Sequence, residues 1–165
     1  MRTPKPDPVK QGEESVWDYP RPPRLEKFGG EVVVFFAGRP IAKTVKAYRV
    51  LETSHPPGYY LPPEDVDQAV LQPSPMQTNC EWKGRGRYFH LISGDQRSEN
   101  AAWYYETPTP AFAPIAGYIS FYPGRTERCT VNGETVIPQP GEFYGGWITS
   151  NIKGPFKGIE GSWGW

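Results

Sequence analysis

The sequence has few of the side chains that hold metal ions or form disulfides. It contains two cysteines, Cys80 and Cys129, and two histidines, His55 and His90. None of the four stands in the spacing of a metal-ligand motif, so no metal site is predicted. Two cysteines without a disulfide framework favour a reducing, intracellular compartment.

An excess of charge of either sign is also absent. Lysine and arginine together number 18, as do aspartate and glutamate, so the formal net charge is zero. This balance argues against nucleic acid as the main partner, because phosphate binding depends on a basic excess. A local basic patch at Lys83, Arg85 and Arg87 is the one feature that points the other way.

Long apolar runs are missing as well. No stretch of about 18 apolar residues occurs, so no membrane span and no membrane partner are predicted. The N-terminal Met-Arg-Thr-Pro-Lys-Pro has no apolar run behind it. No signal peptide is therefore expected, and the protein is assigned to the cytoplasm. Nothing in the sequence indicates an oligomeric state.

Several catalytic and cofactor motifs are absent too. There is no nucleophile elbow, no His-Glu-x-x-His and no dinucleotide-binding glycine run. The loop 154–158, Gly-Pro-Phe-Lys-Gly, lacks the spacing and the following helix of a phosphate-binding loop. No cofactor is therefore indicated. Lys157 in this loop is either a site lysine or a solvated surface charge.

What the sequence has in abundance is aromatic residues, proline and glycine. Aromatic residues make up 15% of the 165 residues, and there are 20 prolines and 18 glycines. Proline and glycine break helices, whereas aromatic side chains suit pleated sheets. We therefore expect a mainly β protein with one antiparallel domain over 29–165. Before it, residues 1–28 form an extended proline-rich arm, anchored by Trp17 and Tyr19 and disordered over about its first dozen residues.

Runs of β-branched and aromatic residues between turn residues predict the strands. They are expected over 31–36, 41–44, 47–52, 88–93, 96–105, 118–122, 127–131 and 134–137. Gly94-Asp95 and Asn132-Gly133 mark two hairpins. One short helix is expected over 63–71, with prolines and acids in its first turn, and a helical turn at 110–114. The tail from Gln139 should wrap on the sheet, because its tryptophans would otherwise be exposed.

The segment 49–60 is the densest candidate for function. It reads Arg-Val-Leu-Glu-Thr-Ser-His-Pro-Pro-Gly-Tyr-Tyr. Alternation along a strand puts Arg49, Leu51 and Thr53 on one face and Val50, Glu52 and Ser54 on the other. His55 then stands at the strand end, where a histidine can act as a general acid or base. The alternative is that Glu52, Ser54 and His55 only satisfy backbone groups at a tight turn.

Three further segments carry candidate residues. Cys80-Glu-Trp-Lys-Gly84 packs a thiol, an acid, an aromatic ring and a lysine together, and Cys80 is expected to be buried and inert unless a base lies near it. Glu99-Asn-Ala-Ala-Trp-Tyr-Tyr105 is either a ligand floor or plain sheet core. The tail contributes Phe143-Tyr-Gly-Gly-Trp147 and Lys157.

These segments resemble the DUF427 family of uncharacterised domains. The resemblance is carried by 49–66 with its Glu-Thr-Ser-His-Pro-Pro core, by 80–84, by 100–105 and by Gly117-Tyr-Ile-Ser-Phe-Tyr122. It covers roughly 30–137, and Trp17-Asp-Tyr-Pro20 and Gly145-Gly-Trp147 extend it. The resemblance implies a compact tent-like or barrel-like β fold with one short helix and a pocket on one sheet face.

The resemblance also implies a set of site residues. Glu52, His55, Trp82, Lys83 and Trp103 are expected to line one site. A nucleotidyltransferase label is sometimes attached to the family, and this sequence does not support it. Such enzymes need a Gly-Gly/Ser motif with nearby paired acids for Mg²⁺, whereas Gly29-Gly30 precedes a plain strand and Asp65 and Asp67 are distant in sequence.

Three hypotheses follow for function. The leading one is a binding module for a small polar or partly apolar molecule. Its pocket is expected to use Arg49, Glu52, His55, Tyr59, Tyr60, Trp82, Lys83, Trp103 and Tyr105. The second is an enzyme that uses Glu52 and His55 as an acid–base pair and Lys83 to stabilise an anion. The third is a protein-interaction module that uses an exposed proline-rich arm and has no enclosed pocket.

Overall fold

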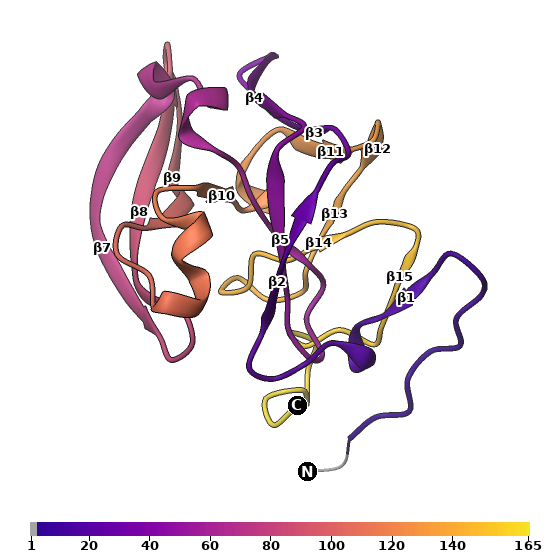
Figure 1. Ribbon diagram of the computed structural model, residues 1–165. Coiled ribbons are helices and arrows are strands. Elements are labelled where there is room, and N and C mark those ends of the chain that lie inside the picture. The colour runs from indigo at the N-terminus through magenta and orange to yellow at the C-terminus, as the bar shows by residue number, and fades with distance from the viewer. Residues whose placement is uncertain (1–2) are drawn as a thin grey trace.

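The computed structural model describes residues 3–165, whose sheets are built mainly from antiparallel strands (Figure 1). Strands account for 45% of the residues and helical turns for 11%, which confirms the mainly β class. In the described part of the chain no sheet closes on itself, so the barrel-like form is not adopted. Met1 and Arg2, the start of the expected arm, lie outside the described residues.

A four-stranded sheet with the order β10-β9-β8-β7 stands at the left of Figure 1. Its strands are β7 (Leu71–Cys80), β8 (Gly84–Ser93), β9 (Gln96–Tyr105) and β10 (Ile119–Phe121). The hairpin of β8 and β9 was predicted from the sequence. β7 was not, because Pro73 and Pro75 indicated a break. A strand at the sheet edge tolerates proline, and the pairing with β8 shifts register between Pro73 and Gln77.

A second four-stranded sheet has the order β12-β11-β3-β4. Its strands are β3 (Val32–Phe36), β4 (Arg39–Thr44), β11 (Arg128–Val131) and β12 (Glu134–Thr135). Asn132 and Gly133 have φ of 49° and 82° and join β11 to β12, as predicted for a tight hairpin turn. Ala37 and Gly38 form the equivalent turn between β3 and β4, with φ of 53° and 78°.

The third sheet has three strands in the order β2-β5-β6 and runs through the centre of Figure 1. They are β2 (Arg24–Phe28), β5 (Ala47–Leu51) and β6 (Gly58–Tyr60). β2 therefore places the last five residues of the segment 1–28 within a sheet. Leu61, just after β6, exchanges two main-chain hydrogen bonds of 2.9 and 2.8 Å with Ile119 of β10. This contact fixes the third sheet against the first.

The expected helix over 63–71 is replaced by two single 3-10 turns at Pro63–Asp65 and Gln68–Val70. Val66 between them is extended, with φ of −116° and ψ of 135°, and it bridges to Ala42 of β4. Tertiary pairing of Val66 therefore outweighs the local helix preference. The longest helical segment is Pro110–Ile115, where a helical turn was predicted. The other 3-10 turns are Val16–Asp18 and Pro123–Arg125.

The main core lies between the first two sheets and the tail. Its fully buried members include Val32, Leu91, Phe121 and Trp147. Trp147 donates from Nε1 to the Phe121 carbonyl at 3.0 Å. The expectation that the tail wraps on the sheets is thus met at Trp147 but not at Trp163, which is 67% exposed.

The two ends of the chain lie against each other (Figure 1). β1 (Glu14–Ser15) pairs in parallel with β15 (Ile152–Lys153), and β13 (Ile137–Pro138) pairs with β14 (Trp147–Ile148). Trp17 Nε1 donates to the Pro155 carbonyl at 3.0 Å, and Tyr19 is buried, so both predicted anchors hold the arm. Within residues 3–165, no helix has the length and apolar character needed to cross a membrane.

Candidate functional site

A cavity of about 380 Å³ lies between the ends of the first and third sheets. Its lining comes from four stretches of the sequence, 50–60, 78–88, 103–105 and 139–146, together with Tyr122 and Lys157. Seven of the nine residues predicted for the site line it: Glu52, His55, Tyr60, Trp82, Lys83, Trp103 and Tyr105.

The turn after β5 carries the two titratable residues that were predicted to act together. The His55 amide donates to the Glu52 carbonyl at 3.0 Å, and Ser54 has a φ of 70°. This tight turn brings His55 Nε2 to 3.6 Å from Glu52 Oε2. Ser54 is fully buried, and its amide donates to the Val16 carbonyl. The left-handed conformation of a non-glycine residue is uncommon and is held here by the packed arm.

The loop Glu81-Trp82-Lys83 forms the second wall at the tip of the β7–β8 hairpin. Thr109 holds this loop from the neighbouring connection. Its hydroxyl donates to the Trp82 carbonyl at 2.6 Å, and its amide donates to the Lys83 carbonyl at 3.0 Å. Both bonds go to main-chain oxygens and leave the Trp82 and Lys83 side chains unengaged by Thr109. Both residues line the cavity.

Aromatic rings form the floor. Trp103 and Tyr105 come from β9 and Tyr60 from β6, and all three are buried. Trp103 Nε1 donates to the Tyr60 hydroxyl at 3.2 Å. The Trp103 ring also packs on Tyr122 with a centroid distance of 4.6 Å. The segment 100–105 therefore belongs to the sheet, and its Trp103 and Tyr105 also line the cavity.

The tail loop closes the remaining side. Gly145 and Gly146 pass so close to the floor that a Cβ on Gly145 would lie 2.3 Å from the Trp103 ring, and one on Gly146 would lie 2.5 Å from Gln139 Oε1. Tyr144 covers His55, with ring centroids 5.3 Å apart. Tyr144 belongs to the tail segment 143–147 that the sequence offered as a candidate, whereas Gln139 was not predicted. The Gly-Gly pair next to aromatic residues was the only local sign of a close backbone approach.

The charges around the cavity keep His55 neutral. Burial, together with the nearby cations Lys157, Lys83 and Arg21, lowers the pKa of His55 from 6.5 to about 3. The pKa of Lys83 is raised overall: burial, the largest effect, lowers it, but its neighbours Tyr60, Cys80 and Glu52 together raise it by more. The site therefore presents a neutral imidazole beside an ammonium group and a carboxylate at neutral pH.

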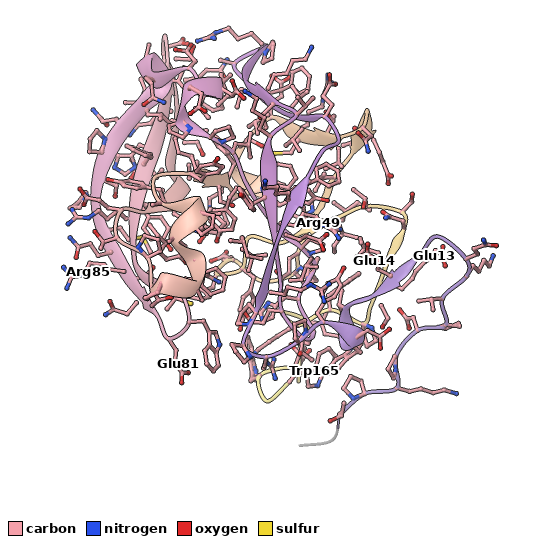
Figure 2. The ribbon with its side chains drawn as sticks, in the orientation of Figure 1. Glu13, Glu14, Arg49, Glu81, Arg85 and Trp165 are labelled. Carbon is pink, nitrogen blue, oxygen red and sulfur yellow. The ribbon has the colours of Figure 1, made fainter. Side chains whose placement is uncertain are left out.

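Two predicted site residues, Arg49 and Tyr59, are outside the lining. Arg49 is 7% exposed and pairs with Glu14 at 3.2 Å and closely with Glu26. Figure 2 shows Arg49 and Glu14 on the side of the central strands away from Glu81 at the hairpin tip. Tyr59 packs on Trp147 at 4.9 Å. Both residues alternate along their strands with ones that face the cavity, so they belong to the opposite face.

Comparison with protein-family models places the chain in a family. A family model described as a domain of unknown function (DUF427), and named for nucleotidyl transfer, matches residues 24–132. The chain belongs to the DUF427 family. No curated protein matches the chain.

The matched part of this DUF427 chain ends before the tail loop. Three walls of the cavity thus lie within residues 24–132, whereas Gln139, Tyr144 and Lys157 lie outside. The acids considered for a nucleotidyl-transfer site are not at the cavity, and Asp67 pairs with Arg39 at 3.0 Å. Among residues 3–165, no cluster of three histidine, cysteine or acidic side chains is arranged to hold a metal ion.

Cys80 was expected from the sequence to be buried, and in the DUF427 domain it is not. It is partly exposed and lines the cavity, whereas Cys129 is fully buried. Burial also raises the pKa of the Cys129 thiol to about 12. Since thiol reagents need an accessible thiolate, the two cysteines should react very differently.

We expect Ellman's reagent to modify one thiol per native chain and two thiols in denaturant. The native signal should vanish in Cys80→Ser and persist in Cys129→Ser, and peptide mass spectrometry would locate the label. Rapid native labelling of Cys80→Ser would mean that the buried and accessible cysteines have been assigned the wrong way round.

Proposed function

We propose that the protein binds a small polar or partly apolar molecule in the cavity. The observation that carries this proposal is the meeting of aromatic walls and charged groups from four separate segments around one hollow. A volume of about 380 Å³ falls within the range of small-molecule sites. Aromatic rings supply contact area, and a few polar groups fix orientation.

Crystal soaks with a fragment library, combined with a thermal-shift screen, test the proposal. Fragments should collect between His55 and Trp82, and the same compounds should raise the unfolding temperature. A ligand at 100 times its Kd stabilises a protein by about 2.7 kcal/mol, which is easily measured. Fragments that collect elsewhere and leave this cavity empty would count against a binding site here.

Matched variants connect any hit to the cavity. Lys83→Met removes the ammonium group and Trp82→Ala removes one wall. Their controls are Lys43→Met, whose side chain is 67% exposed beside Glu31, and Trp163→Ala, also at an exposed position. A cavity ligand should lose at least about tenfold in affinity, or about 1.4 kcal/mol, in the first pair only. Equal losses in both pairs would show that binding does not use the cavity.

An enzyme that uses Glu52 and His55 remains the second candidate, favoured by their separation of 3.6 Å beside Lys83. All three side chains face the same hollow, as acid–base chemistry requires. Incubating each bound fragment with the protein and following its mass would reveal a reaction. Turnover that is lost in Glu52→Gln while binding persists would favour the enzyme, and unchanged fragments would favour the binding module.

A further inference from the structure

Gln139 is a buried side chain whose amide orientation is set by the backbone. It is 5% exposed. Its Oε1 accepts from the Gly146 amide at 3.1 Å, and its Nε2 donates to the Lys157 carbonyl at 2.9 Å. A backbone N–H can only donate and a backbone carbonyl can only accept, so the amide has one orientation. Rotating the amide by half a turn would place its NH₂ group against the Gly146 N–H, and its oxygen against the Lys157 carbonyl. Neither pair could form a hydrogen bond.

The Gln139 Nε2 nitrogen lies 3.1 Å from His55 Nδ1 and carries a second hydrogen that can be donated to it. Because Nε2 of Gln139 is a donor, Nδ1 of His55 has to be the acceptor in this bond. A neutral imidazole that accepts at Nδ1 carries its proton at Nε2. The low pKa of His55 agrees with a ring that stays neutral, since burial and the cations Lys157, Lys83 and Arg21 disfavour its protonated form.

We infer that Gln139 is a positioning residue that holds His55 as the neutral Nε2–H tautomer. The ring then offers the cavity a hydrogen-bond donor. His55 Nε2 lies 3.6 Å from Glu52 Oε2, which is longer than a hydrogen bond. The donor is therefore left for a bound molecule. Tyr144 packs against the ring with centroids 5.3 Å apart.

This arrangement indicates the chemical class of the ligand, and it rests on the proposed function for there being a ligand at all. The ligand atom that meets His55 has to be a hydrogen-bond acceptor, and it lies beside the Glu52 carboxylate. A hydroxyl group suits both neighbours, because it accepts from His55 and donates to Glu52. An ammonium group would face the Nε2–H with a second donor. The cavity therefore fits a hydroxylated molecule with an apolar or ring-shaped part for the aromatic walls.

Long-range proton–nitrogen NMR on the full ¹⁵N-labelled chain tests the tautomer without any ligand. At pH 7 the His55 Nδ1 resonance should fall in the unprotonated region and Nε2 in the protonated region. In Gln139→Met, which removes the donor, the two tautomers should mix. In Gln139→Glu, whose carboxylate accepts, the proton should move to Nδ1 or the ring should become doubly protonated.

His90 is an internal control. Its Nδ1 accepts from the Asn100 backbone amide at 3.0 Å, which no change at Gln139 removes. Its tautomer should be the same in all three proteins, and this also shows that the variants fold. A protonated Nδ1 on wild-type His55 overturns the inference, as does an unchanged tautomer in folded Gln139→Met.

Benzyl alcohol and benzylamine then test the ligand class, because they differ only in the group offered to His55. The alcohol should shift the His55 Nε2 resonance, and the amine should shift it less at equal concentration. An equal response, including none from either compound, overturns the class. The proposed function and the role of Gln139 can be refuted separately. The expected tautomer without any binding would contradict the proposed function, and bound fragments with the other tautomer would contradict the role of Gln139.

Discussion

Replacing Trp147 with alanine is expected to lower the free energy of unfolding by about 3–5 kcal/mol. Trp147 is fully buried and packs on Tyr59 with ring centroids 4.9 Å apart. Its removal leaves a large hole in the core and deprives the Phe121 carbonyl of the indole donor at 3.0 Å. It also loosens the start of β14, which directly follows the tail loop that closes the cavity.

Trp163→Ala is the matched control for this change. Trp163 is 67% exposed, so its removal should change the free energy of unfolding by less than about 0.5 kcal/mol. Urea titrations followed by circular dichroism measure both variants without depending on tryptophan emission. Similar losses in the two proteins, or a negligible loss in Trp147→Ala, would mean that the tail does not dock on the core through Trp147.

The strands that the sequence predicted correctly are those with local signals. The β8–β9 hairpin carries aromatic residues in both strands and turns at Gly94-Asp95. Residues that are neighbours in the sequence therefore decide its form. Asn132-Gly133 likewise determines its own turn. Where a non-local contact decides the outcome, the local reading is wrong. Pro73 and Pro75 hid an edge strand, and the bridge from Val66 to Ala42 broke an expected helix.

Half of the cavity was predictable for the same reason. Glu52 and His55 lie on one turn, and Trp82 and Lys83 lie on one loop, so each pair could be recognised locally. The wall from the tail was not, because Gln139 meets His55 across 84 residues of sequence. Arg49 was an avoidable error, since strand alternation already put it on the face opposite Glu52. Its partners Glu14 and Glu26 are on that other face.

The free energy of unfolding is expected to fall by about 2 kcal/mol as the pH drops from 6.5 to 4.5, because of His55 alone. The folded protein lowers the pKa of His55 from 6.5 to about 3, mainly through burial of a ring whose side chain is 17% exposed. Below pH 6.5 the unfolded chain therefore binds a proton that the folded chain does not bind. The stabilisation is complete above pH 6.5 and is lost progressively toward pH 3, at about 1.4 kcal/mol per pH unit.

The window above pH 4.5 isolates this histidine from the acids. The pKa values of Glu13 and Glu99 are lowered from 4.5, mainly by hydrogen bonds from Lys10 and Arg97 respectively. Their contributions to stability are lost only as the pH falls below 4.5. Urea titrations at pH 7.0, 6.0, 5.0 and 4.5 would therefore report on imidazole protonation.

Two variants assign the slope to one of the two rings. His55→Gln should remove the slope of about 1.4 kcal/mol per pH unit, because the group that resists protonation is gone. His90→Gln removes the other imidazole and should retain the His55 slope, whatever its effect on stability at pH 7. A slope that survives in His55→Gln, or a wild-type protein whose stability is flat from pH 6.5 to 4.5, would show that His55 takes up a proton as readily in the fold as in water. The neutral His55 ring that we assign as a hydrogen-bond donor to the cavity requires a slope in the wild type that is lost in His55→Gln.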